Sequence, residues 1–379
     1  MDVVTPVPAP YLAGPLRLLP FAALRLVPRR VGDPSTGRAF ARPYRDVAAR
    51  LTRWQGRGLL ERDTEPALYL HEYSANGITI RGLVGALDVS NRATSAAEGA
   101  VLPHERIHPG QADDLADRMA EMRLNPAPIL LVHNGSRALR EVLDRIAGGR
   151  PAHRFTDRSQ QDHRIWPIHD ADTLAAIARE LGDTRALIAD GHHRYAAYLR
   201  LQRREPGGAC DQGLAMLVDQ RATPLFLGPI HRTLAGTSFP DVLNAADSIG
   251  IRAEQTDETT AVAALAADRL PFTDGRDWGV LSLKGGTGRP AVEFLHRDIL
   301  PALPHGPSAI GYHHNVDDAL STARNPDTVA VLLPAPSVDT VVQVAAAGRL
   351  LPEKATSFQP KPSLGVLIRS LHDAPDAPS

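Results

Sequence analysis

Seven consecutive residues in the middle of the chain combine the side chains that bind phosphate. They read Ala189-Asp190-Gly191-His192-His193-Arg194-Tyr195. The segment follows an apolar run, predicted as a strand over 185–189, and precedes a predicted helix over 193–203. A glycine between a strand and a helix presents backbone N–H groups at the positive end of the helix dipole, where anions bind. Because two imidazoles and a guanidinium add donors, we predict that Gly191, His192, His193 and Arg194 bind phosphate.

Asp190 ends the predicted strand at this turn. A carboxylate at a strand tip can hold Mg²⁺ or accept a proton, so we predict Asp190 as a catalytic residue and a magnesium ligand. A structural alternative exists, because Asp often caps a helix and Gly often serves a turn. The combination of Asp, Gly, two His and Arg at one strand-to-helix corner favours the functional interpretation.

A second polar cluster precedes a predicted helix that starts near Gln111. It reads Pro103-His104-Glu105-Arg106-Ile107-His108-Pro109. Two prolines stiffen the segment and lower the entropic cost of presenting its side chains. His104 and Glu105 are therefore catalytic candidates, with Glu105 as a general base, or as a metal ligand if it meets Asp190 in space. The alternative is a solvated loop with a Glu-Arg surface pair.

A third polar segment, 352–361, lies before the last predicted strand. Lys354, Thr356 and Lys361 are predicted phosphate contacts, because hydroxyls between two lysines can donate to phosphate oxygens. The alternative is a charged loop. The run Tyr312-His313-His314-Asn315 lacks a third metal ligand, so we expect it to cap a local helix.

Composition sets limits on the partners. The 379 residues contain 42 Lys+Arg and 43 Asp+Glu, a formal net charge of -1. The neutral net charge gives no global field that attracts nucleic acid, and no basic helix-turn-helix pattern is present, so the sequence disfavours nucleic acid as a partner. Apolar runs are shorter than a membrane-spanning helix requires. The single Cys210 forms no internal disulfide, which fits a reducing cytoplasm. The oligomeric state stays open.

The predicted elements are short and mixed. Strands over 67–71 and 78–88 flank Asn76-Gly77, a hairpin signal. The stretch up to Pro43 is predicted as loop, a glycine-rich linker is predicted at 205–209, and a hairpin is predicted over 279–296 around Gly285–Gly288. We expect an α+β fold with mixed sheets and short helices. The predicted divisions are 1–92, an N-terminal helix and hairpin region; 93–208, a phosphate-binding core; 209–371, a second α+β domain; and 372–379, a loose tail.

Several stretches resemble a bacterial family, the domain of unknown function 1015 (DUF1015). They are Trp54–Leu60, Glu65–Tyr69, Val101–Glu105, Asn125–Val132, Ala186–Tyr195, Leu227–Arg232 and Lys354–Gly365. The resemblance runs in order from about residue 15 to 371. Walker-type, Gly-x-Gly-x-x-Gly, His-Glu-x-x-His and Gly-x-Ser-x-Gly motifs are absent.

The Asp-Gly-His-His-Arg run is similar to the phosphate-binding corner of the ParB and sulfiredoxin superfamily, which includes free serine kinases. This resemblance implies a ParB/sulfiredoxin-like core, nucleotide phosphates (ATP or ADP, with Mg²⁺) on His192, His193 and Arg194, and Glu105 as base toward a hydroxyl. The implied function is nucleotide-dependent phosphotransfer to a small metabolite such as serine. The alternatives are a phosphatase of phosphoserine-like esters and a nucleotide-binding module without turnover.

The chain departs from the family pattern at two places. Family members usually carry Pro-Pro-Tyr-Asp-Val near the N-terminus, which this sequence lacks. Where the family usually has Lys-Ser-Thr, this chain has Lys354-Ala355-Thr356. If these groups contact substrate, specificity or activity changes.

Overall fold

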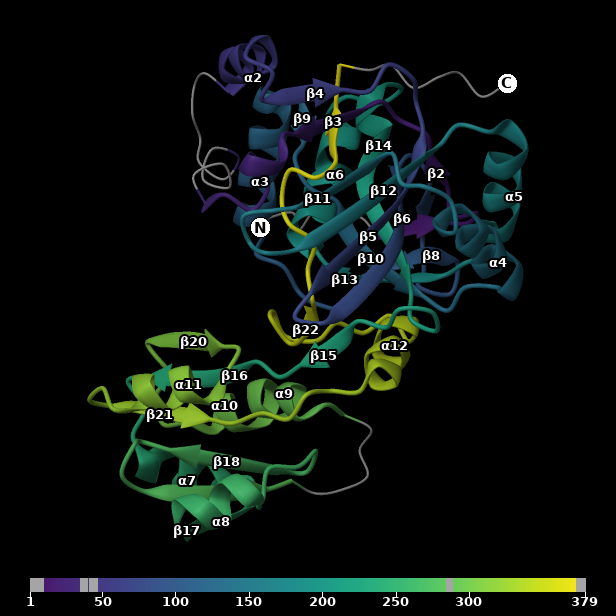
Figure 1. Cartoon of the computed structure of the whole chain (residues 1–379). Coiled ribbons are helices and arrows are strands. Elements are labelled where there is room, and N and C mark those ends of the chain that lie inside the picture. The colour runs from purple at the N-terminus through teal and green to yellow at the C-terminus, as the bar shows by residue number, and fades with distance from the viewer. Residues whose placement is uncertain (1–9, 35–39, 41–46, 284–288, 373–379) are drawn as a thin grey trace.

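The computed structural model describes residues 10–34, 40, 47–283 and 289–372 of the 379. Figure 1 shows a larger unit, which contains the N-terminal half of the chain and its C-terminal strand, and a smaller unit below it. The smaller unit is formed by residues between about 231 and 331. This is an α+β architecture with mixed sheets and short helices, as the sequence predicts.

An 11-stranded sheet forms the centre of the larger unit. Its strands, in spatial order, are β11 (His153–Thr156), β12 (Asp162–Ile168), β5 (Leu68–Ala75), β6 (Ile78–Asp88), β14 (Gln212–Asp219), β10 (Ile129–His133), β13 (Ala186–Asp190), β8 (Gly99–Leu102), β1 (Tyr11–Ala13) and β7 (Arg92–Ala93), with β2 (Leu18–Leu19) beside β6. Two neighbouring pairs, β10 with β14 and β13 with β8, are parallel. The β5–β6 hairpin turns at Asn76 and Gly77, as predicted.

Both faces of this sheet are covered. Along β6, Ile80 and Val84 pack into one hydrophobic cluster, whereas Leu83 and Leu87 pack into another, as the alternation of a strand requires. The helices are α2 (Val47–Gly56), α3 (Pro109–Met122), α4 (Arg137–Ala147), α5 (Ala171–Leu181) and α6 (His192–Arg204). Helices α3 to α6 contribute to the cluster of Leu83 and Leu87.

A four-stranded sheet packs into the other cluster. It consists of β4 (Leu60–Arg62), β3 (Ala23–Leu26), β23 (Ile368–Ser370) and β9 (Leu124–Asn125). The C-terminal strand β23 therefore returns to the N-terminal region, and Figure 1 shows its yellow chain running up from the junction between the units.

The smaller unit contains a six-stranded sheet. Its order is β17 (Arg252–Thr256), β19 (Trp278–Ser282), β18 (Arg269–Thr273), β21 (Thr328–Val331), β16 (His231–Ala235) and β20 (Ala309–His313). Its helices are α7 (Phe239–Ser248), α8 (Glu258–Ala263), α9 (Ala291–Phe294), a π-helix (Leu295–Ile299), α10 (Leu300–Ala302) and α11 (Val316–Ala323). The pair β15 (Phe226–Gly228) and β22 (Ser357–Gln359), with α12 (Val338–Ala346), lies at the junction of the two units.

Three expectations differ from the structure. The first stretch contains strands β1, β2 and β3 rather than loop alone, because distant strands pair with these short segments. No hairpin spans 279–296: β19 pairs with β17 and β18, and the chain is helical from Ala291, while Gly285–Gly288 lie outside the described residues. Finally, β6, β10 and β14 are neighbours, so strands from all three predicted divisions share one sheet and the boundaries at 92 and 208 fall within it.

Candidate active site

The predicted phosphate corner is formed by the end of β13 and the start of α6. Gly191 has φ +93°, and a Cβ there would lie 3.0 Å from Ile129 Cγ2, so only glycine fits this turn without strain. Gly191 is the N-cap of α6, and no side chain in the described part of the chain caps the helix. The first backbone N–H groups of α6 therefore remain available to an anion.

Asp190 is held between two cations. Arg194 Nη2 lies 2.5 Å from Asp190 Oδ2, and Lys361 Nζ lies 2.5 Å from Asp190 Oδ1. Burial by itself raises the pKa of Asp190, but the charges of Arg194 and Lys361 outweigh it and lower this pKa below its usual value. Arg194 Nη1 also donates to the carbonyl of Pro128 at 2.5 Å. Three predicted site residues thus meet, although Lys361 comes from a segment 171 residues away.

His192 and His104 meet behind the corner. Their ring centroids are 4.6 Å apart in an edge-to-face arrangement, and the residues His192 and His104 are 8% and 0% exposed, respectively. Burial lowers the pKa of His192 to about 4 and lowers that of His104 well below its ordinary value. Both rings are therefore neutral at pH 7. They therefore pack beneath the β13–α6 turn as neutral rings and do not offer a positive charge to a ligand.

His193 lies at the surface side of the same helix turn. Its Nε2 accepts a hydrogen bond from the backbone N–H of His108 at 3.1 Å, so it ties α6 to the 103–109 segment. His108 Nε2 in turn contacts the carboxylate of Glu353. Through His108, the 103–109 segment therefore contacts both α6 and the 352–361 segment.

The buried histidines make stability depend on pH. His133, His192, His231 and His296 have pKa values lowered to about 4 by burial. Between pH 6.5 and 4 the unfolded chain binds protons that the folded chain does not, so we expect the free energy of unfolding to decrease as the pH falls through this window. Glu105 has the opposite effect, because its folded pKa of about 7 lets the folded chain bind a proton that the unfolded chain does not. One such group does not offset four histidines.

Urea unfolding at pH 4.5, 5.5, 6.5 and 7.5 measures this dependence. Replacing His192 by Gln removes one titrating group, so the slope decreases by up to about 1.4 kcal/mol per pH unit. An unchanged slope in His192→Gln would mean that His192 is not held neutral.

Glu105 faces the 352–361 segment. Its Oε1 accepts a hydrogen bond from the backbone N–H of Lys354, and its Oε2 lies 3.3 Å from the hydroxyl of Thr356. His104 Nε2 lies 2.8 Å from the same hydroxyl, so Thr356 joins both catalytic candidates. Burial raises the pKa of Glu105 to about 7, and the charge of Asp190 contributes in the same direction. A carboxylate with this pKa is suited to accept a proton near neutral pH.

Lys354 is held in a left-handed backbone conformation, with φ +50°. Arg232, which is 0% exposed, fixes this position because its Nη2 donates to the Lys354 carbonyl at 2.9 Å. The ring of Tyr312 lies 4.6 Å from both the Arg232 guanidinium and Lys354 Nζ, as in cation–π contacts.

Arg232 and Tyr312 were not among the predicted site residues. The family-like stretch Leu227–Arg232 was the only signal in the sequence for Arg232.

Arg232 is expected to contribute strongly to stability. Besides Lys354, it donates to the carbonyl of Ile230 at 2.7 Å and to His296 Nε2 at 3.2 Å. Arg232→Met leaves these buried acceptors without a donor, so we expect it to lower the free energy of unfolding by about 2–4 kcal/mol. Urea unfolding tests this, with the exposed Arg137→Met as a matched control. A loss below 0.5 kcal/mol would contradict this role for Arg232.

Lys361 is positioned through its backbone. Gln161 Nε2 donates to the Lys361 carbonyl at 2.9 Å, and Gln161 Oε1 accepts from the N–H of Ser363 at 3.1 Å. Tyr73 donates to the adjacent carbonyl of Pro360 at 2.7 Å. The 360–363 backbone is therefore clamped while the Lys361 side chain stays 43% exposed. Only three of the 42 basic residues are lysines, and two of them, Lys354 and Lys361, lie here.

A resident metal ion does not fit these side chains. The described ranges contain no group of three or more His, Cys, Asp or Glu placed to hold a metal. Both oxygens of Asp190 already face a cation. Mg²⁺ is often held by one or two carboxylates together with substrate phosphates, so the ion would have to arrive on a nucleotide as part of the substrate. Asp190 as a ligand of that ion stays a prediction.

The other polar features are structural. Asn315 caps α11 by accepting from the N–H of Asp318 at 2.8 Å, as expected for the Tyr312–Asn315 run. Cys210 is buried and contacts Glu205. No helix in the described part of the chain is long and apolar enough to cross a lipid bilayer.

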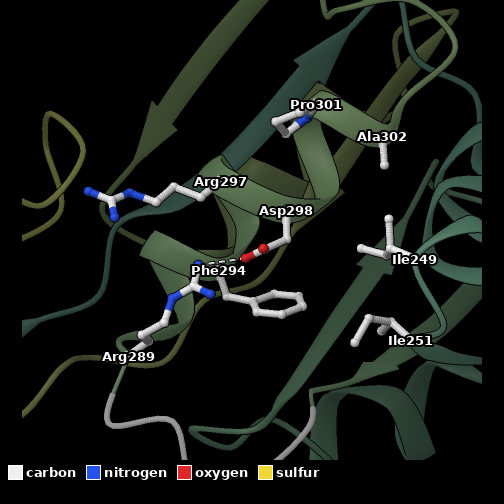
Figure 2. A pocket seen from close by; sticks show the side chains of 8 residues that line it. All are labelled: Ile249, Ile251, Arg289, Phe294, Arg297, Asp298, Pro301 and Ala302. Atoms are coloured by element: carbon white, nitrogen blue, oxygen red, sulfur yellow. Dashed lines mark hydrogen bonds and ion pairs between the residues drawn. The ribbon is translucent and has the colours of Figure 1, made fainter.

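A separate cavity of about 470 Å³ lies in the smaller unit. Figure 2 shows Arg289 and Asp298 joined in an ion pair of 2.6 Å beside Phe294, with Ile249 and Ile251 opposite them. The charges at its centre pair with each other, and none of the predicted site residues lines it. We therefore place the candidate site at the β13–α6 corner.

Comparison with known proteins places the chain in a family. Residues 18–268, more than half of the chain, match the family model described as Protein of unknown function (DUF1015). The chain therefore belongs to the DUF1015 family, as its motifs indicate. No curated protein matches the sequence.

Several solved structures are similar to this fold. A free serine kinase variant in complex with ADP has 14% identity and a TM-score of 0.42, over 71% of this chain and 89% of that one. A conserved hypothetical protein from Pyrococcus furiosus has 13% identity and a TM-score of 0.41, over 72% and 93%. SbnI with a C-terminal truncation from Staphylococcus aureus has 11% identity and a TM-score of 0.44, over 76% and 87%.

Proposed function

We propose that this protein transfers a phosphoryl group from a nucleotide, ATP or ADP, to the hydroxyl of a small metabolite. One observation carries the proposal: Glu105, with a pKa of about 7, is linked through Thr356 and His104 to His192, the first residue of α6, and the neighbouring Asp190 pairs with Arg194 and Lys361. A base and a cationic phosphate site in one place are what phosphoryl transfer requires, because the reaction depends on positioning and charge neutralisation.

In this proposal the nucleotide phosphates bind the first N–H groups of α6 together with Lys361 and Arg194. Asp190 holds both cations in place before the nucleotide binds, since each is 2.5 Å from one of its oxygens. The phosphate oxygens then share these cations with Asp190. Lys354, which is exposed, adds a further positive charge at the rim. Mg²⁺ carried by the nucleotide neutralises phosphate charge in the same place.

Glu105 acts on the acceptor. The hydroxyl oxygen forms a bond to the terminal phosphorus while the bond from that phosphorus to the leaving phosphate oxygen breaks, and the hydroxyl proton passes to Glu105. The hydrogen bonds from the Lys354 N–H and the Thr356 hydroxyl hold the carboxylate in a fixed orientation. The resemblance of the Asp-Gly-His-His-Arg run to free serine kinases makes L-serine the first acceptor to test.

Incubation of the purified protein with L-serine, Mg²⁺ and either ATP or ADP tests this function. We expect phosphoserine, with ADP or AMP as the other product, detected by ³¹P NMR and mass spectrometry. Asp190→Asn serves as the inactive control. A panel of small alcohols is tested as acceptors in the same way. If free phosphate is released and none of these alcohols is phosphorylated, the protein is a hydrolase instead. Nucleotide binding without turnover would identify a binding module.

A further inference from the structure

A cavity of about 860 Å³ lies along the flank of α6, beside the 106–109 loop and the start of α3. Its walls are largely apolar and include Ile107, Ala196, Leu199 and Leu350. The volume is within the range of small-molecule sites, which is about 300–1,000 Å³. None of the residues assigned above to phosphoryl transfer lines it.

Arginines surround this apolar floor. Five line the cavity, whereas Asp113 is the only carboxylate that does so among the described residues; the five are Arg92, Arg106, Arg200, Arg203 and Arg204. Arg200 pairs with Asp113 at 2.5 Å, and Arg204 pairs with Asp117, which lies outside the lining, at 2.6 Å. Within the described ranges, the other three arginines of the lining, Arg92, Arg106 and Arg203, pair with no carboxylate.

Two of these arginines have no counter-charge of their own. The side chains of Arg106 and Arg203 form no hydrogen bond or ion pair in the part of the chain that the structure describes, and both are exposed. Among the described residues, Arg92 bonds only to neutral oxygens, those of the Leu199 carbonyl at 3.1 Å and the Gln202 side chain at 3.5 Å. Burial and the charge of Arg203 lower the pKa of Arg92, so the cations repel one another in the unliganded protein.

We propose that this cavity binds an amphiphilic phosphate ester, a molecule with an apolar or aromatic body and at least two negative charges. The body lies on Leu199 and Leu350, and the phosphate is shared by Arg92, Arg106 and Arg203. This site is distinct from the corner at the start of α6. Arg106 and Ile107 directly follow Glu105, so the ligand is either the phosphorylated form of the acceptor or a separate effector next to the catalytic segment.

Isothermal titration with 1-naphthyl phosphate tests the site. We expect it to bind at least ~10-fold more tightly than 1-naphthol or inorganic phosphate, because each lacks one half of the recognised chemistry. The double variant Arg106→Met/Arg203→Met should weaken binding at least ~10-fold, whereas Arg137→Met and Lys361→Met should leave it within ~2-fold of the wild type. Leu350→Asp provides a second variant that places a negative charge on the floor.

The proposal is overturned if either fragment binds as tightly as the ester, or if both the double variant and Leu350→Asp bind like the wild type. A loss of binding in Lys361→Met equal to that in the double variant places the probe at the α6 corner and also overturns it. Titration does not require turnover, so its outcome is separate from that of the proposed phosphotransfer.

The effect of 1-naphthyl phosphate on turnover distinguishes the two kinds of ligand. Inhibition that is competitive with the acceptor identifies the cavity as the acceptor pocket, and any other kinetic effect identifies it as an effector site.

Discussion

Glu105→Gln is expected to lower kcat for phosphotransfer by about 10³-fold and to leave the Kd for nucleotide within ~3-fold of the wild type. The substitution keeps an oxygen that can accept from the Lys354 N–H, so the local structure persists while the base is lost. Steady-state kinetics and isothermal titration measure the two effects. Glu141→Gln, on the exposed surface of α4, is the matched control.

The pH profile gives this prediction a second readout. The base must be deprotonated, and burial raises the pKa of Glu105 to about 7, so kcat/KM rises with pH through 7 and levels off above it. In Glu105→Gln the residual activity loses this acidic limb. If the variant keeps both the limb and more than a tenth of the activity, Glu105 is not the base.

Lys361→Met is expected to raise the Kd for Mg-nucleotide by at least ~10-fold and to lower kcat by about 10²-fold. The variant removes a phosphate donor and leaves Asp190 Oδ1 without its cation, so the carboxylate repels the incoming phosphates. Lys361→Arg keeps the charge and should recover most of the binding. Nucleotide affinity equal to that of the wild type in Lys361→Met would contradict this role.

The scarcity of lysine allows an independent check of the same prediction. An acyl phosphate derivative of ATP transfers its acyl group to amines near the bound phosphates, and the chain has only three lysines, Lys284, Lys354 and Lys361. We expect peptide mapping to find labelling of Lys361, and to a lesser extent Lys354, that excess ATP suppresses. Labelling confined to Lys284 would place the nucleotide elsewhere.

The local part of the site could be predicted from the sequence. An apolar run, one glycine and a helical pattern specify the β13–α6 corner through neighbouring residues, and the Asn76-Gly77 turn specifies its hairpin in the same way. The role of Glu105 as a general base, which the second polar cluster indicates, stays a prediction. These features depend on short-range rules of turns and helix starts.

The remaining features depend on contacts between distant segments. The sequence alone does not show that β14 inserts between β6 and β10, that Lys361 reaches Asp190, or that Arg232 is buried under the Lys354 backbone. It also presents His192 as a polar residue at a helix start, whereas His104 covers its ring and burial removes its charge. Burial depends on the assembled fold, so the sequence alone does not show which of the predicted phosphate donors are positively charged.

The most direct measurement is a crystal structure of the protein with Mg²⁺ and a non-hydrolysable ATP analogue. The account predicts phosphate oxygens within hydrogen-bond distance of the His192 and His193 backbone N–H groups and of Lys361 Nζ, with the terminal phosphate toward Glu105. A nucleotide bound in the cavity beside Arg289, or no bound nucleotide at saturating concentration, would contradict it.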